Sequence, residues 1–346
     1  MPPTEGGGME INMKLEKSIN KLKELSDFFC KNDIEDIYTN SKIYEVLIAY
    51  QLGHKIINGH AHTFDAIDQD GNTCEYKHYK KSSSNHTWTF NDYTDETIQN
   101  LHKVNSVYFV VIDDRATIPK LKKIYVVSGK EVAKYLTRKK TSIKNHRKMM
   151  NISERKIVDN MSYKLLDKGE IKSLNPTRES LYYTKLKEVF TTAREIEEEI
   201  KVNGILTSNK LWELLVACNL GHRINSEQKK HDAYDADDRT YEYKVSKKST
   251  WTFQDISNNV LKSYLNDERI ILAVVNKKTF VIKSIAACQP KAIVRILRKK
   301  LKEKKLKEKK LKEKIRKSKK IRRLTANIGM KDINQMIEAG DAEWIL

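Results

Sequence analysis

Asp65, Glu75 and Lys77 have the side-chain types and spacing that phosphodiester hydrolysis requires. On a strand, residues two apart project from the same face, so Glu75 and Lys77 point together, and a hairpin would bring Asp65 beside them from the preceding strand. Two converging carboxylates form a hard-oxygen site suited to Mg²⁺, which polarises a phosphoryl oxygen and lowers the pKa of bound water. The lysine can orient the attacking water or offset the charge that grows on phosphorus.

The same pattern, Asp-x9-Glu-x-Lys, occurs a second time at identical spacing in Asp232, Glu242 and Lys244. One copy alone would be explained more simply as surface acids and a lysine on a polar hairpin, because the pattern is short. Two copies, inside segments that differ at many intervening positions, favour the catalytic interpretation.

The two triads lie within a longer internal repeat, which sets the domain organisation. We predict two homologous domains, residues 10–165 and 178–346, of which the second has a lysine-rich insert at 298–323. The aligned segments are 41–57 with 209–225, 64–77 with 231–244, and 87–90 with 250–253.

Each copy has the pattern of an α/β (α+β) domain in which helices flank a mixed central sheet. Gly53 and Gly221 are expected to end the second helix of each copy. The predicted helices are 15–29, 43–52, 92–103 and 130–135 in the first copy, and 180–200, 211–220, 255–264 and 291–296 in the second. The predicted strands include 73–78 and the apolar runs 107–112 and 270–275.

The basic charge of this 346-residue chain is concentrated in one segment. The formal net charge is +20, but residues 298–323 contain 17 Lys or Arg against three Glu, which leaves about +6 for the rest. The run is either a solvated lysine-rich helix or tail, or an arm that holds a polyanion by counterion release. Charge by itself therefore does not decide the function.

The sequence also indicates the cellular compartment in which the protein is expected. The longest apolar runs have six residues, far short of the ~20 of a membrane-spanning helix, and the first residues lack the apolar stretch of a secretory signal. The four cysteines are widely separated, which argues against a disulfide framework and a zinc site. We expect a cytoplasmic protein without a membrane partner.

The triads and their surroundings resemble PvuII-like restriction endonucleases of the PD-(D/E)XK nuclease superfamily. The resemblance includes Asp-Ala-Ile-Asp at 65–68 and Asp-Ala-Tyr-Asp at 232–235, and extends to 32–48 and 330–340 at low identity. It implies two tandem restriction-endonuclease-like domains with Mg²⁺ as cofactor. The implied metal ligands are Asp65 and Glu75, then Asp232 and Glu242, with Lys77 and Lys244 as catalytic partners.

Glu45 and Glu213 occupy matching places on the predicted second helix of each copy. Many members of this superfamily have a supporting glutamate near the metal at such a place. An exposed helix glutamate explains the two residues equally well, so both interpretations stay open.

The segment that would read DNA departs from the family pattern, because Thr-Trp-Thr-Phe replaces a histidine-rich strand. Thr, Asn and Gln side chains can still hydrogen-bond base edges in the major groove. Alternating aromatics are also typical of core-facing strand positions, and we expect at least one aromatic of each copy to lie in the core. The recognition sequence therefore cannot be transferred. The candidate DNA-contacting residues are Thr87, Trp88, Thr89, Asn91 and Asn151 in the first copy, and Thr250, Trp251, Thr252, Gln254 and Asn327 in the second.

Together these features predict a Mg²⁺-dependent endonuclease that cleaves double-stranded DNA as a single-chain pseudo-dimer. Ordinary relatives act as homodimers with one site per subunit, whereas a duplicated chain would supply both sites as a monomer. Type II restriction, beside a cognate DNA methyltransferase, is the expected role. The alternatives are a structure-selective repair or recombination nuclease, a DNA-binding protein with vestigial sites, and cleavage of RNA.

Overall fold

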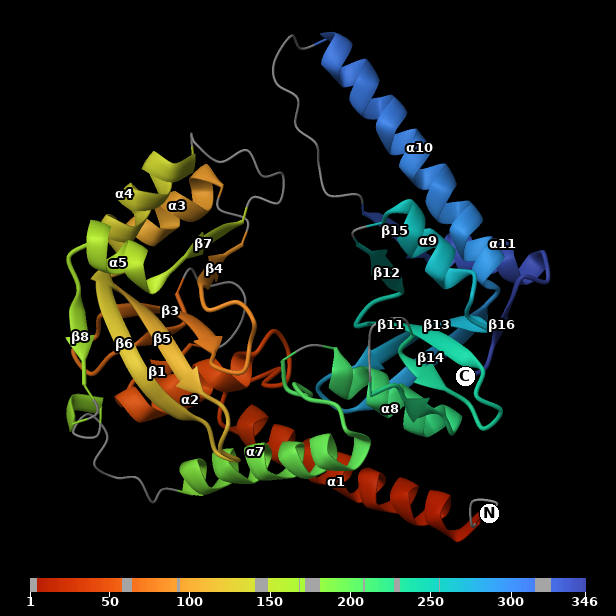
Figure 1. Ribbon diagram of the computed structural model, residues 1–346, viewed down its shortest axis with the longest axis horizontal. Coiled ribbons are helices and arrows are strands. Elements are labelled where there is room, and N and C mark those ends of the chain that lie inside the picture. Colours follow the sequence, from red (N-terminus) through yellow and green to blue (C-terminus); the bar gives the residue numbers. More distant parts are fainter. Residues whose placement is uncertain are drawn as a thin grey trace. The chain divides into compact units, whose positions relative to one another are not determined.

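The computed structural model describes residues 5–57, 64–91, 94–140, 149–167, 169–171, 181–207, 209–226, 231–254, 256–314 and 325–346 (Figure 1). Its contacts divide the chain into two compact units. The first unit is residues 24–194, and the second unit is residues 1–23 together with 195–346. Helices α1 (Glu5–Lys31) and α7 (Leu181–Ile200) therefore each contribute residues to both units, a division that the repeat alone does not predict.

The first unit is built on a mixed six-stranded sheet with the strand order β1-β2-β3-β5-β6-β8. Strands β3 and β5 are parallel, and the other neighbouring pairs are antiparallel. Figure 1 shows α2 beside β1, and α3, α4 and α5 gathered near β4 and β7. The elements are α2 (Lys42–Leu52), β1 (Lys55–Ile56), β2 (Ala66–Ile67), β3 (Thr73–Lys80), β4 (Trp88–Phe90), α3 (Asp95–His102), β5 (Ser106–Asp113), β6 (Lys120–Ser128), α4 (Gly129–Lys140), β7 (Met150–Ile152), α5 (Glu154–Asn160) and β8 (Lys164–Leu166).

The second unit has a mixed six-stranded sheet with the order β16-β14-β13-β11-β10-β9. Strands β11 and β13 are its parallel pair, and the other neighbours are antiparallel. The elements are α8 (Lys210–Leu220), β9 (Arg223–Ile224), β10 (Ala233–Tyr234), β11 (Thr240–Ser246), β12 (Thr250–Phe253), α9 (Asn258–Tyr264), β13 (Arg269–Asn276), β14 (Val281–Cys288), α10 (Pro290–Lys314), β15 (Ala326–Gly329), α11 (Met330–Glu338) and β16 (Ala342–Trp344).

The two sheets have the same topology. Read in reverse, the second strand order matches the first strand by strand, with the single parallel pair in the same place. Gly53 and Gly221 end α2 and α8 in the left-handed conformation, with φ of 68° and 70°, which favours glycine because it has no Cβ. The predicted fold class, two tandem domains of mixed sheet and flanking helices, is confirmed.

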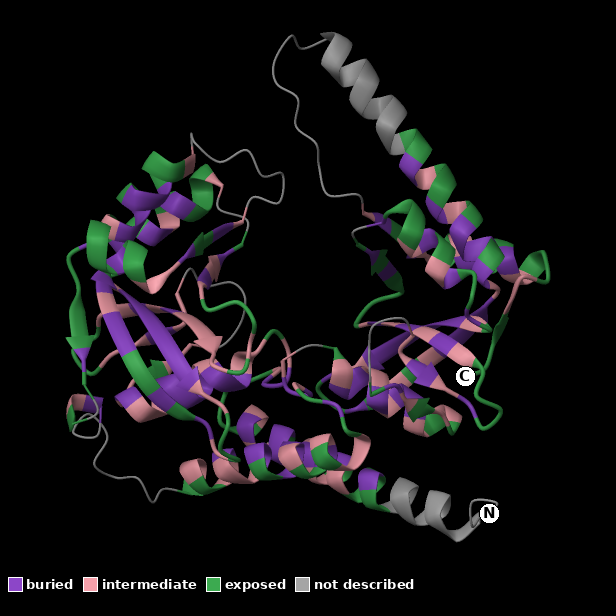
Figure 2. Cartoon of the chain, in the orientation of Figure 1, coloured by how far each residue is buried: buried purple, intermediate pink, exposed green. Residues whose placement is uncertain are grey.

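Each unit also contains a two-stranded antiparallel ribbon, which packs on the core through alternate residues. We call β4 with β7 the first ribbon and β12 with β15 the second ribbon. Trp88 and Phe90 belong to the core of the first unit, and Trp251 and Phe253 to that of the second. Strands β5 and β13 are buried along almost their whole length as well (Figure 2). The period of two in Thr-Trp-Thr-Phe thus gives each ribbon an apolar inner face and a polar outer face.

The lysine-rich run begins as the continuation of α10. Leu297 and Leu301 are buried in the core of the second unit, and the helix continues to Lys314. Residues 315–323 of the predicted insert lie outside the described residues. Among the described helices, none is long and apolar enough to cross a membrane.

Candidate active site

In the first unit, the β2–β3 hairpin brings Asp65 against the strand that carries Glu75 and Lys77. The Asp65 N–H donates to the carbonyl oxygen of Cys74 at 2.8 Å, and Asp65 Oδ2 accepts the N–H of Tyr76 at 2.7 Å. The Lys77 ammonium contacts the Glu75 carboxylate and donates to the Tyr76 carbonyl oxygen at 3.2 Å. The three residues singled out in the sequence therefore lie in one cluster.

The second unit builds the same cluster from its own hairpin, β10–β11. Asp232 donates its N–H to the Tyr241 carbonyl oxygen at 2.9 Å, and its Oδ2 accepts the N–H of Tyr243 at 2.8 Å. Lys244 contacts Glu242 and donates to the Tyr243 carbonyl oxygen at 3.2 Å. Corresponding distances in the two units thus agree to 0.1 Å.

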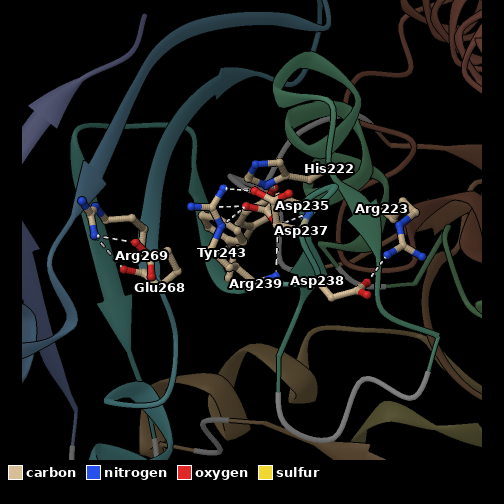
Figure 3. A network of polar contacts seen from close by, with 10 residues as sticks. His222, Arg223, Asp235, Asp237, Asp238, Arg239, Tyr243, Glu268 and Arg269 are labelled. Carbon is tan, nitrogen blue, oxygen red and sulfur yellow. Dashed lines mark hydrogen bonds and ion pairs between the residues drawn. The ribbon is translucent and has the colours of Figure 1, made fainter. Parts of the chain in front are cut away.

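The second aspartate of Asp-Ala-x-Asp fixes the hairpin turn. Asp235 accepts hydrogen bonds from the backbone N–H groups of Asp237 and Arg239, from Arg239 Nε at 2.7 Å and from the Tyr241 hydroxyl at 2.9 Å (Figure 3). Asp68 closes the equivalent turn of the first unit through backbone and side-chain donors. These bonds set the hairpin register, which places the first aspartate opposite the glutamate.

The residue between Glu and Lys is anchored on the other face of the sheet. The Tyr76 hydroxyl hydrogen-bonds His54 Nδ1 at 2.8 Å, and the Tyr243 hydroxyl hydrogen-bonds His222 Nδ1 at 2.7 Å. Because successive strand side chains alternate between faces, these bonds hold Glu and Lys toward the cluster.

The helices α2 and α8 add a glutamate and a lysine to each cluster. Lys42 pairs with Glu45 at 3.0 Å, and Lys210 pairs with Glu213 at 3.1 Å and approaches Asp232 Oδ1 at 3.8 Å. The glutamates are therefore not solvated helix residues. The lysines were missed by the sequence interpretation, although their presence at matching repeat positions was a usable signal.

Burial and mutual repulsion perturb the acids of both clusters. Burial, and then the nearby Asp65 carboxylate, raise the pKa of Glu45 to about 7. Burial is also the main cause that raises the pKa of Glu75 and of Glu213, and it raises that of Glu242 to about 7. Burial alone would lower the pKa of Lys77, but the Glu75 and Asp65 carboxylates outweigh it and raise the pKa, so Lys77 is an ammonium.

The donor chemistry fits Mg²⁺, since carboxylate and carbonyl oxygens are its preferred protein ligands. Within the described part of the chain, no three Asp, Glu, His or Cys side chains form a group that could hold a metal ion. The Lys77 and Lys244 ammonium groups instead contact the Glu75 and Glu242 carboxylates. Two carboxylates with waters could bind Mg²⁺ once the lysine moves off its glutamate.

In each unit, the ribbon brings together candidate DNA-contacting residues from segments that are far apart in the sequence. Thr89 is paired with Asn151 in the first ribbon, and its hydroxyl donates to Asn151 Oδ1 at 2.9 Å. Thr252 is paired with Asn327 in the second ribbon, and both are exposed. The remaining polar candidates, Thr87, Asn91, Thr250 and Gln254, lie at or beside the ribbon ends.

Trp88 and Trp251 are not available for DNA contact, which corrects the sequence interpretation. Their exposed fractions are 0% and 1%, and their indole N–H groups donate to the carbonyl oxygens of Val110 and Ala273. Both tryptophans face inward because they occupy the apolar positions of the alternating strand.

A pocket of about 440 Å³ in the second unit connects the cluster with the second ribbon. Its lining includes Glu213 and Lys244 of the cluster, and Thr250, Thr252 and Gln254 in or next to the second ribbon. A ligand in this pocket could therefore touch the charged cluster and the polar ribbon face at the same time.

Comparison with known proteins gives no further assignment. No family model matches the chain, and no curated protein matches it. The argument for function accordingly rests on the two clusters and the two ribbons.

We expect His78 to make the stability of the first unit sensitive to acid. It stacks on Tyr44, and burial, followed by Lys77 and Lys80, lowers its pKa to about 4. Because the pKa of His78 is lower in the folded than in the unfolded state, its contribution to stability is complete above about pH 6.5 and is lost as the pH falls toward 4. The loss is at most about 3.4 kcal/mol.

The equivalent strand position in the second unit is Val245. We therefore expect His78→Val to flatten the loss of unfolding free energy between pH 6.5 and 4, measured by urea denaturation. Parallel pH profiles for this variant and the wild type would contradict the expectation.

Proposed function

We propose that the chain is a Mg²⁺-dependent endonuclease that hydrolyses double-stranded DNA, with one catalytic cluster in each unit. One observation carries the proposal: two hairpins, one in each unit, hold Asp, Glu and Lys in the same hydrogen-bonded arrangement. Acids and lysines on a solvated polar hairpin would not be expected to adopt one and the same hydrogen-bonded geometry in both copies. The resemblance to PvuII-like restriction endonucleases supports the same activity and a role in type II restriction.

The chain's own groups have distinct parts in this proposal. When bound, Mg²⁺ supplies charge stabilisation and an activated water. Asp65 and Glu75 would hold it in the first unit, and Asp232 and Glu242 in the second. Lys77, which is held in its charged form by the adjacent carboxylates, offsets negative charge on the phosphate in the transition state rather than accepting a proton.

The outer faces of the ribbons supply the proposed sequence readout. A two-stranded antiparallel ribbon fits the major groove, and Thr, Asn and Gln can hydrogen-bond base edges there. The two ribbons differ at their ends, with Asn91 in the first where Gln254 stands in the second. The two half-sites therefore need not be identical.

Metal dependence tests the proposed function most directly. We expect Mg²⁺ or Mn²⁺ to support plasmid cleavage, Ca²⁺ to support binding only, and EDTA to abolish cleavage. Discrete bands on a gel would identify sequence-specific cutting, and a smear would favour the alternative of a structure-selective or nonspecific nuclease. A gel shift without cleavage would favour a DNA-binding protein with vestigial sites, and full activity in EDTA would refute the mechanism.

The basic arm, residues 302–323, is expected to contact DNA phosphates without reading sequence. Its deletion should start after Leu301, because Leu301 is buried and Lys300 donates to the Asn327 carbonyl oxygen at 2.8 Å. The shortened protein should bind all duplexes more weakly and with a shallower salt dependence. The log–log slope should fall by about 0.9 for each DNA phosphate that the arm neutralises in the full chain.

Replacement of the lysines in the arm by glutamine is the matched control, since it keeps the length and removes the charge. Both variants should behave alike in filter-binding assays over a salt series. If neither variant changes affinity at any salt concentration, the arm takes no part in DNA binding and this part of the proposal fails.

A further inference from the structure

A second lysine lies in each carboxylate cluster, in addition to the lysine of the Asp-Glu-Lys triad. Lys42 pairs with Glu45 at 3.0 Å and reaches the Ile57 carbonyl oxygen at 3.5 Å, while the Ile57 N–H donates to the Asp65 carbonyl oxygen at 2.8 Å. This lysine thus connects the first turn of α2 with the backbone that leads into the catalytic hairpin.

Lys210 has the equivalent position in the second unit. It pairs with Glu213 at 3.1 Å and lies 3.8 Å from Asp232 Oδ1. The side chains of Lys42 and Lys210 are only 18% and 20% exposed. Ordering and partly burying a lysine is unfavourable unless it is well paired, so its occurrence in both copies requires a reason beyond solubility.

The charges of the cluster supply that reason. When all three acids of a unit are ionised, the helix glutamate and the strand Asp and Glu face two ammonium groups, which gives a formal charge of −1. Without the helix lysine the charge would be −2, and the acids would repel one another more strongly. Each ammonium group lies against a carboxylate of the cluster. Among the described residues, no three acids, histidines or cysteines form a group that could hold a metal ion.

We propose that Lys42 and Lys210 are positioning residues that act as internal counter-ions, holding the helix glutamate on the catalytic hairpin and opposing divalent-cation binding in the free protein. The inference rests on the proposed function, because it assumes that the cluster binds such a cation. Its consequence is that Mg²⁺ binds weakly until the phosphate of a substrate adds negative charge to the site.

Calcium titration of the full chain tests the proposal without relying on activity. The Asp232→Ala background isolates the first cluster, and isothermal titration calorimetry at a pH of about 8 measures Ca²⁺ affinity. In that background, Lys42→Met should bind Ca²⁺ at least about tenfold more tightly and should show a larger rise in melting temperature on adding Ca²⁺. Lys42→Arg, which keeps the charge, should stay within about twofold of the background.

Lys81→Met is the matched control, since Lys81 pairs with Asp113 and not with the cluster, and it should change Ca²⁺ affinity less than about twofold. Lys210→Met in the Asp65→Ala background should reproduce the effect in the second unit. If Lys42 had only a structural role, its loss would weaken Ca²⁺ binding. Unchanged or weaker Ca²⁺ binding by Lys42→Met would therefore overturn the counter-ion proposal but not the proposed metal function. If Asp65→Ala combined with Asp232→Ala does not weaken Ca²⁺ binding relative to the wild type, the proposed metal function fails together with it.

Discussion

Asp65→Ala and, separately, Asp232→Ala are each expected to convert double-strand cleavage of a plasmid into nicking. Each substitution removes a proposed metal ligand, the carboxylate whose Oδ2 also accepts a backbone N–H, and leaves the other cluster intact. Because each unit contains a complete set of Asp, Glu and Lys, one strand should still be hydrolysed at a near-normal rate. The rate at the altered site should fall by at least about 10²-fold, as on removal of one transition-state-stabilising group.

Strand-resolved cleavage of an end-labelled duplex checks this expectation, since the two variants should cut opposite strands. Asp70→Ala is the matched control: it is the same substitution on the first hairpin, but Asp70 is exposed and its carboxylate has no part in the cluster. Linearisation of plasmid at the wild-type rate by either variant would exclude its altered site from catalysis. Loss of all nicking in one variant would instead indicate a single composite site.

The grouping of Asp, Glu and Lys into one cluster per unit and the fold class could be predicted because the sequence contains both patterns twice. The repeat fixed which residues correspond, and the helix and strand periodicities placed Glu75 and Lys77 on one face of a strand. Local turn chemistry at Asp68 and Asp235 then determined the register that brings the first aspartate to them. Within each copy, these steps depend on residues close together in the chain.

The other features of the candidate site, the helix lysines and the pairing within the ribbons, depend on tertiary contacts that no local sequence pattern specifies. Lys42 and Lys210 begin amphipathic helices, where a lysine is usually solvated, and only the tertiary approach of the hairpin gives them their partners. The pairing of Thr89 with Asn151, 62 residues later, is likewise a tertiary contact. The alternation in Thr-Trp-Thr-Phe predicted at least one core aromatic in each copy, and the structure buries both aromatics of each ribbon, which excludes Trp88 and Trp251 as DNA contacts.

We expect substitutions on the inner face of the second ribbon to lower stability, and substitutions on its outer face to change cleavage specificity without lowering stability. Trp251 is fully enclosed and donates to the Ala273 carbonyl oxygen at 2.9 Å, so Trp251→Ala should lower the unfolding free energy of its unit by about 3–5 kcal/mol. Trp251→Phe keeps most of the volume and loses the N–H, so it should cost about 1–3 kcal/mol. Urea denaturation of the two variants and the wild type measures both values.

Thr252→Ala and Asn327→Ala change exposed side chains of the outer face and should alter stability by no more than about 0.5 kcal/mol. If the ribbon reads bases, each should relax cleavage specificity at one base pair, because a good side-chain pairing with a base edge supplies about 1–3 kcal/mol of discrimination. Cleavage of a randomised-site library would detect this at a single position of the half-site read by the second unit. Unchanged cleavage patterns for both variants would show that the outer face does not read bases, because nothing in the fold requires these two side chains.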